Sequence, residues 1–265
     1  MPAAALHPDV PPASCRAPLL LARALLLVVA LLAGCATAPP AERPREVPPP
    51  LTVRPDVEPN FLVPSRRERM IVLATQEWSL FGQPIVTYDA AGAPIVTFLG
   101  TTAHEVQPAM LTRVLMYWYG VNRAPIVGPE GELRAWSAAF IAWLARSAGY
   151  TRDEFPDTVR HWDYISRFAN ADGKAPFVAR DPARYAPRIG DLVCNARGAV
   201  VEFASLQPGG YHCDIVVFAD GDAIESIGGN VSDVVARSRL PVDALGLLMP
   251  LPDRPWAAVL ELVGP

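Results

Sequence analysis

The chain has 265 residues and a formal net charge of −4, from 23 Lys and Arg against 27 Asp and Glu. No cluster of Lys and Arg stands out after residue 35, so the charge pattern argues against a nucleic-acid-binding protein. The length would suit one or two domains, but the N-terminal part is not globular in composition. We therefore expect one domain of ordinary size, over residues 65–265.

The first 34 residues have the features of a secretory signal. Arg16 and Arg23 precede an apolar run over residues 25–33, which is well short of the ~20 residues of a transmembrane helix. The run ends in Leu32-Ala33-Gly34-Cys35, which resembles the lipobox of bacterial lipoproteins, where the signal is cut before a Cys that then carries diacylglycerol. The resemblance predicts a signal peptide over 1–34 and a lipidated Cys35; an uncleaved N-terminal anchor is the alternative.

Residues 35–64 are predicted to be a tether between the lipid and the domain. They are dense in proline, including Pro39-Pro40 and Pro48-Pro49-Pro50, and such segments favour an extended, semi-rigid conformation. Ala36 after the Cys, by resemblance to other lipoproteins, favours the outer membrane. The expected location is the cell envelope, lipid-anchored and facing the periplasm.

Four helices are predicted in the domain. Ser65-Arg66-Arg67-Glu68 fits a capping box, so the first helix should follow Ser65, run to about Leu80 and stop at Gly82. In the third helix, Ser137 and the apolar residues after it fall at helical spacing on one face. Ser137 would then lie in the first turn and point toward the core. The other three helices are expected over 108–119, 134–148 and 156–168.

Five strands are predicted. Two lie between the first and second helices, and three follow the fourth helix. They span residues 85–88, 95–98, 191–194, 211–218 and 223–227, and Gly228-Gly229-Asn230 marks a turn after the last one. Helices followed by an antiparallel sheet predict an α+β fold, with N-terminal helices packed on a small antiparallel sheet.

Three segments carry a resemblance to known hydrolases. Trp136-Ser137-Ala138-Ala139-Phe140 resembles the tryptophan–cysteine–alanine segment of CHAP and NlpC-type cell-wall hydrolases, with Ser in the Cys position. Gly190-Asp191-Leu192-Val193 and residues 211–217 resemble their glycine–aspartate and histidine strands. From Trp136 to Leu240 the chain is most similar to the bacterial family called domain of unknown function 2272, a relative of these enzymes. The resemblance implies a papain-like fold.

The residues themselves allow catalytic roles to be assigned. A hydroxyl needs a base within hydrogen-bond reach, and His212 is the one histidine on a predicted strand, so Ser137 would be the nucleophile and His212 the base. Asn230 is our first choice to orient the imidazole, and Glu225 the second. Asp214 shares a strand face with His212 but lies a pleat away, so we place it near the site rather than as the orienting residue.

Each assignment has a structural alternative. A small residue such as Ser137 can face a sheet simply because nothing larger fits, and Ser cannot form the thiolate on which papain-like sites rely. His212 could be a satisfied core histidine. His161, which also resembles a segment of the family, is a possible site-lining residue or a solvated helix histidine stacked on Trp162. Trp136 is a further possible lining residue.

Cys194 and Cys213 are the two cysteines left after the leader and the lipidated Cys35. The resemblance places them on neighbouring antiparallel strands, and the expected compartment permits disulfides, so we predict that they are bonded; buried free thiols are the alternative. No Cys/His set has zinc spacing, so neither a metal nor another cofactor is predicted.

Two functions follow from these expectations. The first is an envelope lipoprotein that hydrolyses, or transfers, amide bonds of peptidoglycan peptides with Ser137 in place of Cys. The second is a non-catalytic lipoprotein that binds peptidoglycan or an envelope protein through the same cleft. The expected partners are therefore peptidoglycan peptides or an envelope protein, and the membrane through Cys35.

Overall fold

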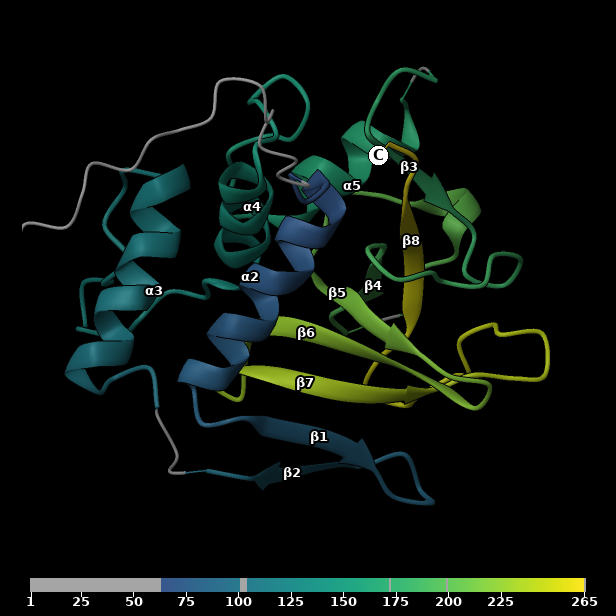
Figure 1. The fold of residues 1–265 in the computed structure, drawn as a ribbon, viewed down its shortest axis with the longest axis horizontal. Helices are drawn as coiled ribbons and strands as arrows, with labels where there is room; N and C mark the ends of the chain where they lie inside the picture. The colour runs from purple at the N-terminus through teal and green to yellow at the C-terminus, as the bar shows by residue number, and fades with distance from the viewer. Residues whose placement is uncertain (1–62, 101–103, 172, 199, 265) are drawn as a thin grey trace, which may run out of the picture. The chain divides into compact units, whose positions relative to one another are not determined.

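A computed structural model of the chain describes residues 63–100, 104–171, 173–198 and 200–264 (Figure 1). The predicted signal peptide, Cys35 and nearly all of the tether lie outside the described residues. Within the described ranges, no helix combines the length and the apolar character needed to cross a bilayer.

In the part of the chain that the structure describes, eight strands form one sheet in the order β2-β1-β7-β6-β5-β4-β8-β3 (Figure 1). Neighbouring strands run antiparallel except β1 and β7, which are parallel, with Ile85 opposite Arg237. The strands are β1 (Pro84–Tyr88), β2 (Pro94–Phe98), β3 (Phe177–Arg180), β4 (Leu192–Ala196), β5 (Tyr211–Ala219), β6 (Ala223–Val231), β7 (Val234–Pro241) and β8 (Trp256–Leu262).

Four α-helices accompany this sheet in the described residues, so the α+β class is confirmed. Three of them, α2, α4 and α5, contact the strands, while α3 packs on α4 (Figure 1). The helices are α2 (Arg66–Leu80), α3 (Pro108–Val121), α4 (Ser137–Ala148) and α5 (His161–Ala169), and a 3₁₀ helix, η1, covers Phe203–Ser205.

The expectation of a small antiparallel sheet is wrong. The sheet is mixed because the N-terminal hairpin of β1 and β2 joins the later strands through the parallel β1–β7 pair. It is also larger, because β3, β7 and β8 were not expected. The last predicted strand continues to Val231, so Gly228 and Gly229 lie within β6 and are not a turn; the register of β6 against β7 shifts between Gly228 and Val231.

The predicted start of α2 is confirmed. Ser65 Oγ accepts a hydrogen bond from the Glu68 amide at 3.2 Å, and the Ser65 amide donates to Glu68 Oε2 at 2.7 Å. This reciprocal pair satisfies two amides that a helix N-terminus otherwise leaves without partners.

Two helices begin later than predicted. The helix with Ser137 starts at that residue and not at Arg134, whose amide instead donates to the Ile126 carbonyl at 2.8 Å. The last helix starts at His161 and not at residue 156, because Asp157 is held by Arg146 in a non-helical segment, at 2.6 Å. Both shifts place a candidate site residue at the first position of a helix.

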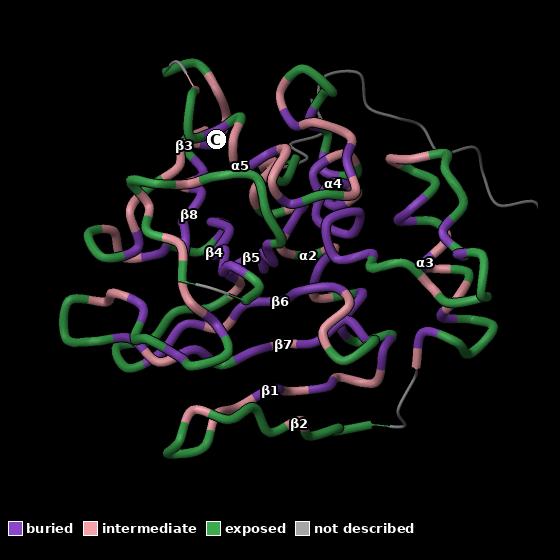
Figure 2. The backbone as a smooth tube through the Cα atoms, turned by 180° about the vertical axis from the view of Figure 1, so that it is seen from behind, coloured by how far each residue is buried: buried purple, intermediate pink, exposed green. Residues whose placement is uncertain are grey.

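Helix α4 is the central helix of the fold. Nearly all of its residues are buried, which is typical of a helix surrounded by other elements, and its alanines allow close packing on β5 and β6. Figure 2 shows α4 and the middle strands buried, whereas the edge strand β2 is largely exposed.

The sheet has a core on each face. The larger one lies between the helices and one face. The smaller one uses the alternate residues of the strands, such as Val193 and Val216, and the segment over residues 242–251 packs on it. The central strands, which carry the candidate site, are therefore buried on both sides.

Candidate functional site

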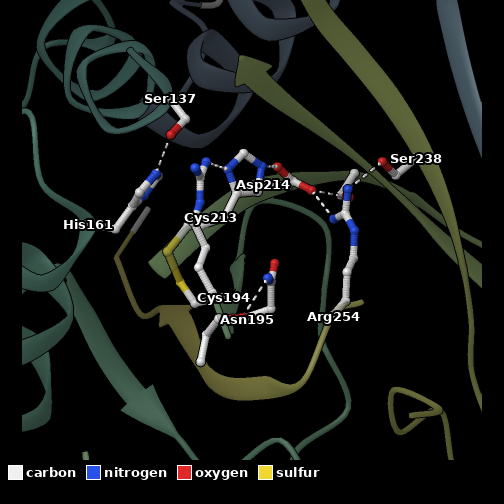
Figure 3. A network of polar contacts seen from close by, with 12 residues as sticks. Ser137, His161, Cys194, Asn195, Cys213, Asp214, Ser238 and Arg254 are labelled. Carbon is white, nitrogen blue, oxygen red and sulfur yellow. Dashed lines mark hydrogen bonds and ion pairs between the residues drawn. A yellow bond between two sulfur atoms is a disulfide. The ribbon is translucent and has the colours of Figure 1, made fainter. Parts of the chain in front are cut away.

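Ser137 is the first residue of α4, and its hydroxyl contacts the first residue of another helix. Ser137 Oγ lies 2.8 Å from His161 Nε2, at hydrogen-bond distance, and Figure 3 shows the two side chains facing each other. Both side chains are nearly buried, with Ser137 3% and His161 5% exposed. The N-terminal amides of α4 give this position a positive local potential, which stabilises developing negative charge.

His161 is held on its other side by Tyr164. Its Nδ1 contacts the Tyr164 hydroxyl one turn along α5. Burial, followed by the charges of Asp214 and Asp163, raises the pKa of Tyr164 well above 10, so the phenol keeps its proton. With Nδ1–H donating to this oxygen, Nε2 of His161 is free to accept the proton of Ser137.

The electrostatic surroundings of His161 keep its imidazole neutral. Burial is the main cause, and the electrostatic effects of His212 and of Arg197 act in the same direction, so the pKa of His161 lies well below 6.5. Asp214 opposes this effect without reversing it. At neutral pH, His161 is therefore an unprotonated base beside a hydroxyl.

His212 contacts a carboxylate from its own strand. His212 and Asp214 are two residues apart on β5 and so share one face of the sheet, and His212 Nε2 lies 2.7 Å from Asp214 Oδ1. Asp214 is fully buried, and its second oxygen pairs with Arg254 at 2.6 Å. Arg254 in turn donates to Ser238 Oγ at 3.2 Å; Figure 3 shows Asp214, Arg254 and Ser238 in this order.

The charges around Asp214 keep it ionised. Burial opposes ionisation, but the attraction of His212 and then of Arg254 outweighs it and holds the pKa of Asp214 below its ordinary value. A buried carboxylate can stabilise a positive charge on the imidazole that it contacts.

Gly228 provides the space for this contact. A Cβ at Gly228 would lie 1.8 Å from Asp214 Oδ1 and 3.1 Å from His212 Nε2. Gly229 has a similar role toward α4, because its Cβ would lie 2.7 Å from Phe140 Cβ. The two glycines are in a strand because other elements approach its backbone closely.

Arg197, directly after β4, contacts the other nitrogen of His212. Its Nη2 lies 3.3 Å from His212 Nδ1. Because a guanidinium only donates, Nδ1 must be the acceptor, and the ring proton of neutral His212 is on Nε2, facing Asp214. The Nδ1 lone pair, which could act as a base, is thus occupied by Arg197.

The two histidines are close but line different cavities. Their ring centroids are 5.5 Å apart, with the planes tilted by 58°. One cavity of about 190 Å³ is lined by Ser137 and His161, and another of about 190 Å³ by His212 and Asn230. Among the described residues, Arg197 alone lines both.

Asn230, our expected orienting residue for His212, instead contacts the start of α4. Its Oδ1 accepts from the Trp136 amide at 3.3 Å, and its Nδ2 donates to Glu105 and to Asp233, each at 3.4 Å. Glu105 also accepts from Trp136 Nε1 at 2.6 Å. Asn230 therefore contacts the start of α4, the helix that begins with Ser137, and the carboxylate that contacts His212 is that of Asp214.

Asp214 was not expected to orient His212, because it lies one pleat away along the strand, but its carboxylate does contact the ring. A residue two positions along a strand lies on the same face, and the long imidazole reaches it because Gly228 on the next strand leaves room. Glu225, the second choice, pairs with Arg237 and, at 3.4 Å, with Arg239. The His-x-Asp spacing on a strand is the sequence signal that could have identified the pair.

The remaining candidates also have defined surroundings. Trp136 is fully buried in the main core and lines neither cavity. His161 is buried and not solvated, and Trp162 stacks on Tyr211, with ring centroids 5.7 Å apart, rather than on His161. Sequence reasoning did not single out Arg197, Tyr164 or Arg254.

The predicted disulfide is confirmed. Cys194 on β4 is bonded to Cys213, which lies directly opposite it on β5, and both are fully buried (Figure 3). In the chain-entropy treatment, closing a loop of this size contributes about 3 kcal/mol. The bond fixes β5 beside His212, the residue that precedes Cys213.

In the part of the chain that the structure describes, no three His, Cys, Asp or Glu side chains are grouped so that they could hold a metal ion. The described residues of the site bring together one hydroxyl, two imidazoles, a buried carboxylate and a guanidinium, which are groups suited to acid–base and nucleophilic chemistry.

Residues 105–262 match a bacterial family described as "Uncharacterized protein conserved in bacteria (DUF2272)". The chain belongs to this family. The matched region contains Ser137, His161, Arg197, His212 and Asp214, whereas α2, β1 and β2 precede it. No curated protein and no solved structure gives a match.

Proposed function

We propose that this protein is an envelope lipoprotein that hydrolyses amide bonds of peptidoglycan peptides on a papain-like scaffold, with Ser137 as nucleophile and His161 as its base. The observation that supports this most directly is the 2.8 Å contact between Ser137 Oγ and His161 Nε2 at the N-terminus of α4. The choice of substrate rests on the resemblance to cell-wall hydrolases and on the predicted export of the chain.

The proposed reaction uses the site as a proton relay. Ser137 Oγ attacks the amide carbonyl while its proton moves to His161 Nε2, and the N-terminal amides of α4 stabilise the oxyanion that forms. His161 then gives the proton to the leaving amine, and an ester on Ser137 remains. Water, deprotonated by the same imidazole, hydrolyses this ester and restores the hydroxyl.

His212, which contacts Asp214, is the second candidate for the base. Sequence reasoning gave His212 the role that we now assign to His161, and the buried carboxylate beside His212 is the feature that favours the original assignment. The two assignments make different predictions for single substitutions, so one set of variants separates them.

The test follows peptide products by mass spectrometry after the full-length protein is incubated with peptidoglycan fragments. Ser137→Ala should abolish most turnover. His161→Gln should lower it by about 10²–10⁴-fold if His161 is the base, and His212→Gln should then lower it less. Ser137→Cys should retain activity and become sensitive to thiol alkylation.

Ser205→Ala is the matched control, because Ser205 is an exposed serine on η1 whose hydroxyl contacts only the Glu202 carbonyl. It should leave turnover unchanged. A larger loss with His212→Gln than with His161→Gln would return the role of base to His212. If neither the wild type nor Ser137→Cys cleaves any fragment, the enzymatic proposal is wrong.

A non-catalytic binding lipoprotein is the second candidate function. The observation that favours it is Arg197, which lies between the cavity with Ser137 and the cavity with His212, together with the 3% exposure of Ser137. In that case the wild type should bind the fragments without cleaving them.

A further inference from the structure

Arg197 is a cation with no acidic partner at the centre of the candidate site. Among the described residues, no carboxylate pairs with its guanidinium, and its one side-chain contact is His212 Nδ1. A second arginine, Arg160, lines the cavity with Ser137, but it is already paired with Asp163 at 3.1 Å. Arg197 is therefore the arginine of this cavity whose charge has no opposite charge beside it.

The surroundings of Arg197 leave space for a ligand. Gly209 and Gly210, which line the same cavity, carry no side chains to fill it, and the Gly210 carbonyl accepts the Arg197 amide at 2.8 Å. This bond fixes the backbone from which the side chain reaches both cavities. The residue as a whole is exposed, so a ligand can approach the guanidinium from solvent.

We propose that Arg197 binds a carboxylate of the substrate and so directs the enzyme to amide bonds that have a free carboxylate nearby. A guanidinium matches the geometry of a carboxylate with two parallel hydrogen bonds, which His212 with its single acceptor does not provide. The inference deepens the proposed function and rests on it, because it names the class of substrate that the Ser137 site takes.

Binding of a carboxylate would also change the two imidazoles. As the guanidinium turns toward the ligand, His212 Nδ1 loses its donor and becomes free to accept a proton. The charge of Arg197, which disfavours protonation of His161, is at the same time compensated by the carboxylate. Recognition of the correct substrate thus makes the bases of the site stronger.

The test uses a peptidoglycan-derived peptide and derivatives in which one carboxylate at a time is converted to the carboxamide. For the wild type, one of these conversions should lower kcat/KM by roughly 10- to 100-fold, the range expected for a lost charge-assisted hydrogen bond. Arg197→Gln should lower kcat/KM for the parent peptide by a similar factor and leave that carboxamide almost unaffected. The kcat/KM of Arg197→Lys for the parent peptide should lie between those of the wild type and Arg197→Gln, since lysine keeps the charge but cannot make the two parallel hydrogen bonds of a guanidinium.

Arg184→Gln removes the same charge from an exposed arginine that lies near Asp181 and lines neither cavity, so its kcat/KM for every peptide should equal that of the wild type. If all peptides are cleaved equally well, or if Arg197→Gln slows all of them by one factor, the inference about Arg197 is wrong while the hydrolase stands.

Binding to the Ser137→Ala variant, measured by calorimetry, separates the two proposals if no peptide is cleaved. In one outcome, one carboxamide binds more weakly than the parent peptide, and this difference disappears when Arg197→Gln is added. That outcome would support Arg197 as the carboxylate-binding residue of a non-catalytic protein. Equal affinity for all peptides, with no cleavage, would overturn both proposals.

Discussion

His161 and His212 are the same residue type in one small site, but they have different partners. His161 faces a hydroxyl on each side, Ser137 and Tyr164, whereas His212 faces the carboxylate of Asp214 and the guanidinium of Arg197. A hydroxyl can give up a proton to a neutral imidazole, and a carboxylate stabilises an imidazolium. The neighbours therefore suit His161 to accept the proton of Ser137, whereas each nitrogen of His212 already faces a charged side chain.

The lowered pKa of His161 predicts a loss of stability in mild acid. The unfolded chain binds a proton at His161 as the pH falls through about 6.5, while the folded protein binds it only at lower pH. Between these two values the unfolded state gains protons, so the free energy of unfolding falls with pH. From pH 7 to 5.5 this should cost about 1 kcal/mol, measured by urea denaturation, and His161→Gln should remove that part of the loss.

Ser205→Ala is the control for this measurement, because Ser205 is an exposed residue of η1 that carries no titratable group. It should lose as much stability between the two pH values as the wild type does. An equal loss in the His161→Gln variant would show that His161 is not kept neutral by its surroundings.

The residues of the site were predictable where their role depends on local sequence. Ser137 in the first turn of a helix and Cys213 on the opposite strand face from His212 follow from helical and strand periods. The contacts of His161 and Arg197 could not be predicted, because each depends on where a helix or a loop lies relative to distant strands. Charge alone does not indicate which of the arginines would reach the site.

Strand β6 shows how an element far from the nucleophile shapes the site. Its two adjacent glycines face different neighbours, Gly228 the pair of His212 and Asp214, and Gly229 the side chain of Phe140 on α4. Periodicity does not distinguish a glycine in a turn from one in a strand that other elements approach. For this reason the sequence indicated a turn at residues 228–230, where the strand in fact continues.

Gly228→Ala should damage the site through the strand. The added Cβ would lie 1.8 Å from Asp214 Oδ1, so the carboxylate must move away from His212. Overpacking of this kind typically costs 1–3 kcal/mol, so we expect the free energy of unfolding to fall by about that amount. Turnover of peptidoglycan fragments should fall as well, since the His212 contact is broken.

Gly221→Ala is the matched control, because Gly221 lies in the turn between β5 and β6 and a Cβ there meets nothing within 4 Å. It should leave both the stability and the turnover close to those of the wild type. Similar stability of the two alanine variants would mean that Asp214 does not need the space at Gly228.

The helices and strands that were predicted carry a local signal in the sequence, and those that were missed do not. Helix α2 was found because its capping box is a local signal, and α4 because Ser137 and the apolar residues after it fall at helical spacing. In the structure, Gly149 ends α4 in the left-handed conformation, with φ of 100°. Strands β7 and β8 were missed. Charged side chains interrupt the apolar pattern of β7, and the buried run of β8 contains alanines that are equally typical of a helix.

At the scale of the whole molecule, the region that matches the family does not include all strands of the sheet. Helix α2 and strands β1 and β2 precede residue 105, yet β1 pairs with β7 and Arg67 donates to the Leu262 carbonyl at 2.7 Å. The buried Glu77 of α2 also pairs with Arg113 of α3. Contacts from both ends of the chain thus hold the elements that carry the site.

The predicted lipid anchor at Cys35 can be tested in the cell. If Cys35 is lipidated, a fatty-acid label should be incorporated into the wild type, and Cys35→Ala should abolish this incorporation. Cys15→Ala is the control, because it removes a cysteine that leaves with the predicted signal peptide, and labelling should persist. Equal labelling of the Cys35→Ala variant and the wild type would refute the lipoprotein assignment.

The strand order has a consequence for how the chain folds as it is made. Strand β1 reaches the rest of the sheet only through β7, and β3, at the other edge of the described sheet, pairs only with β8. Strands β1 and β2 can pair with each other early, but they join the rest of the sheet only after β7 has been synthesised, and β3 has no strand partner before β8. Such long-range pairing is slow. If the chain is exported before it folds, as we propose, this order delays closure of the sheet until export is complete.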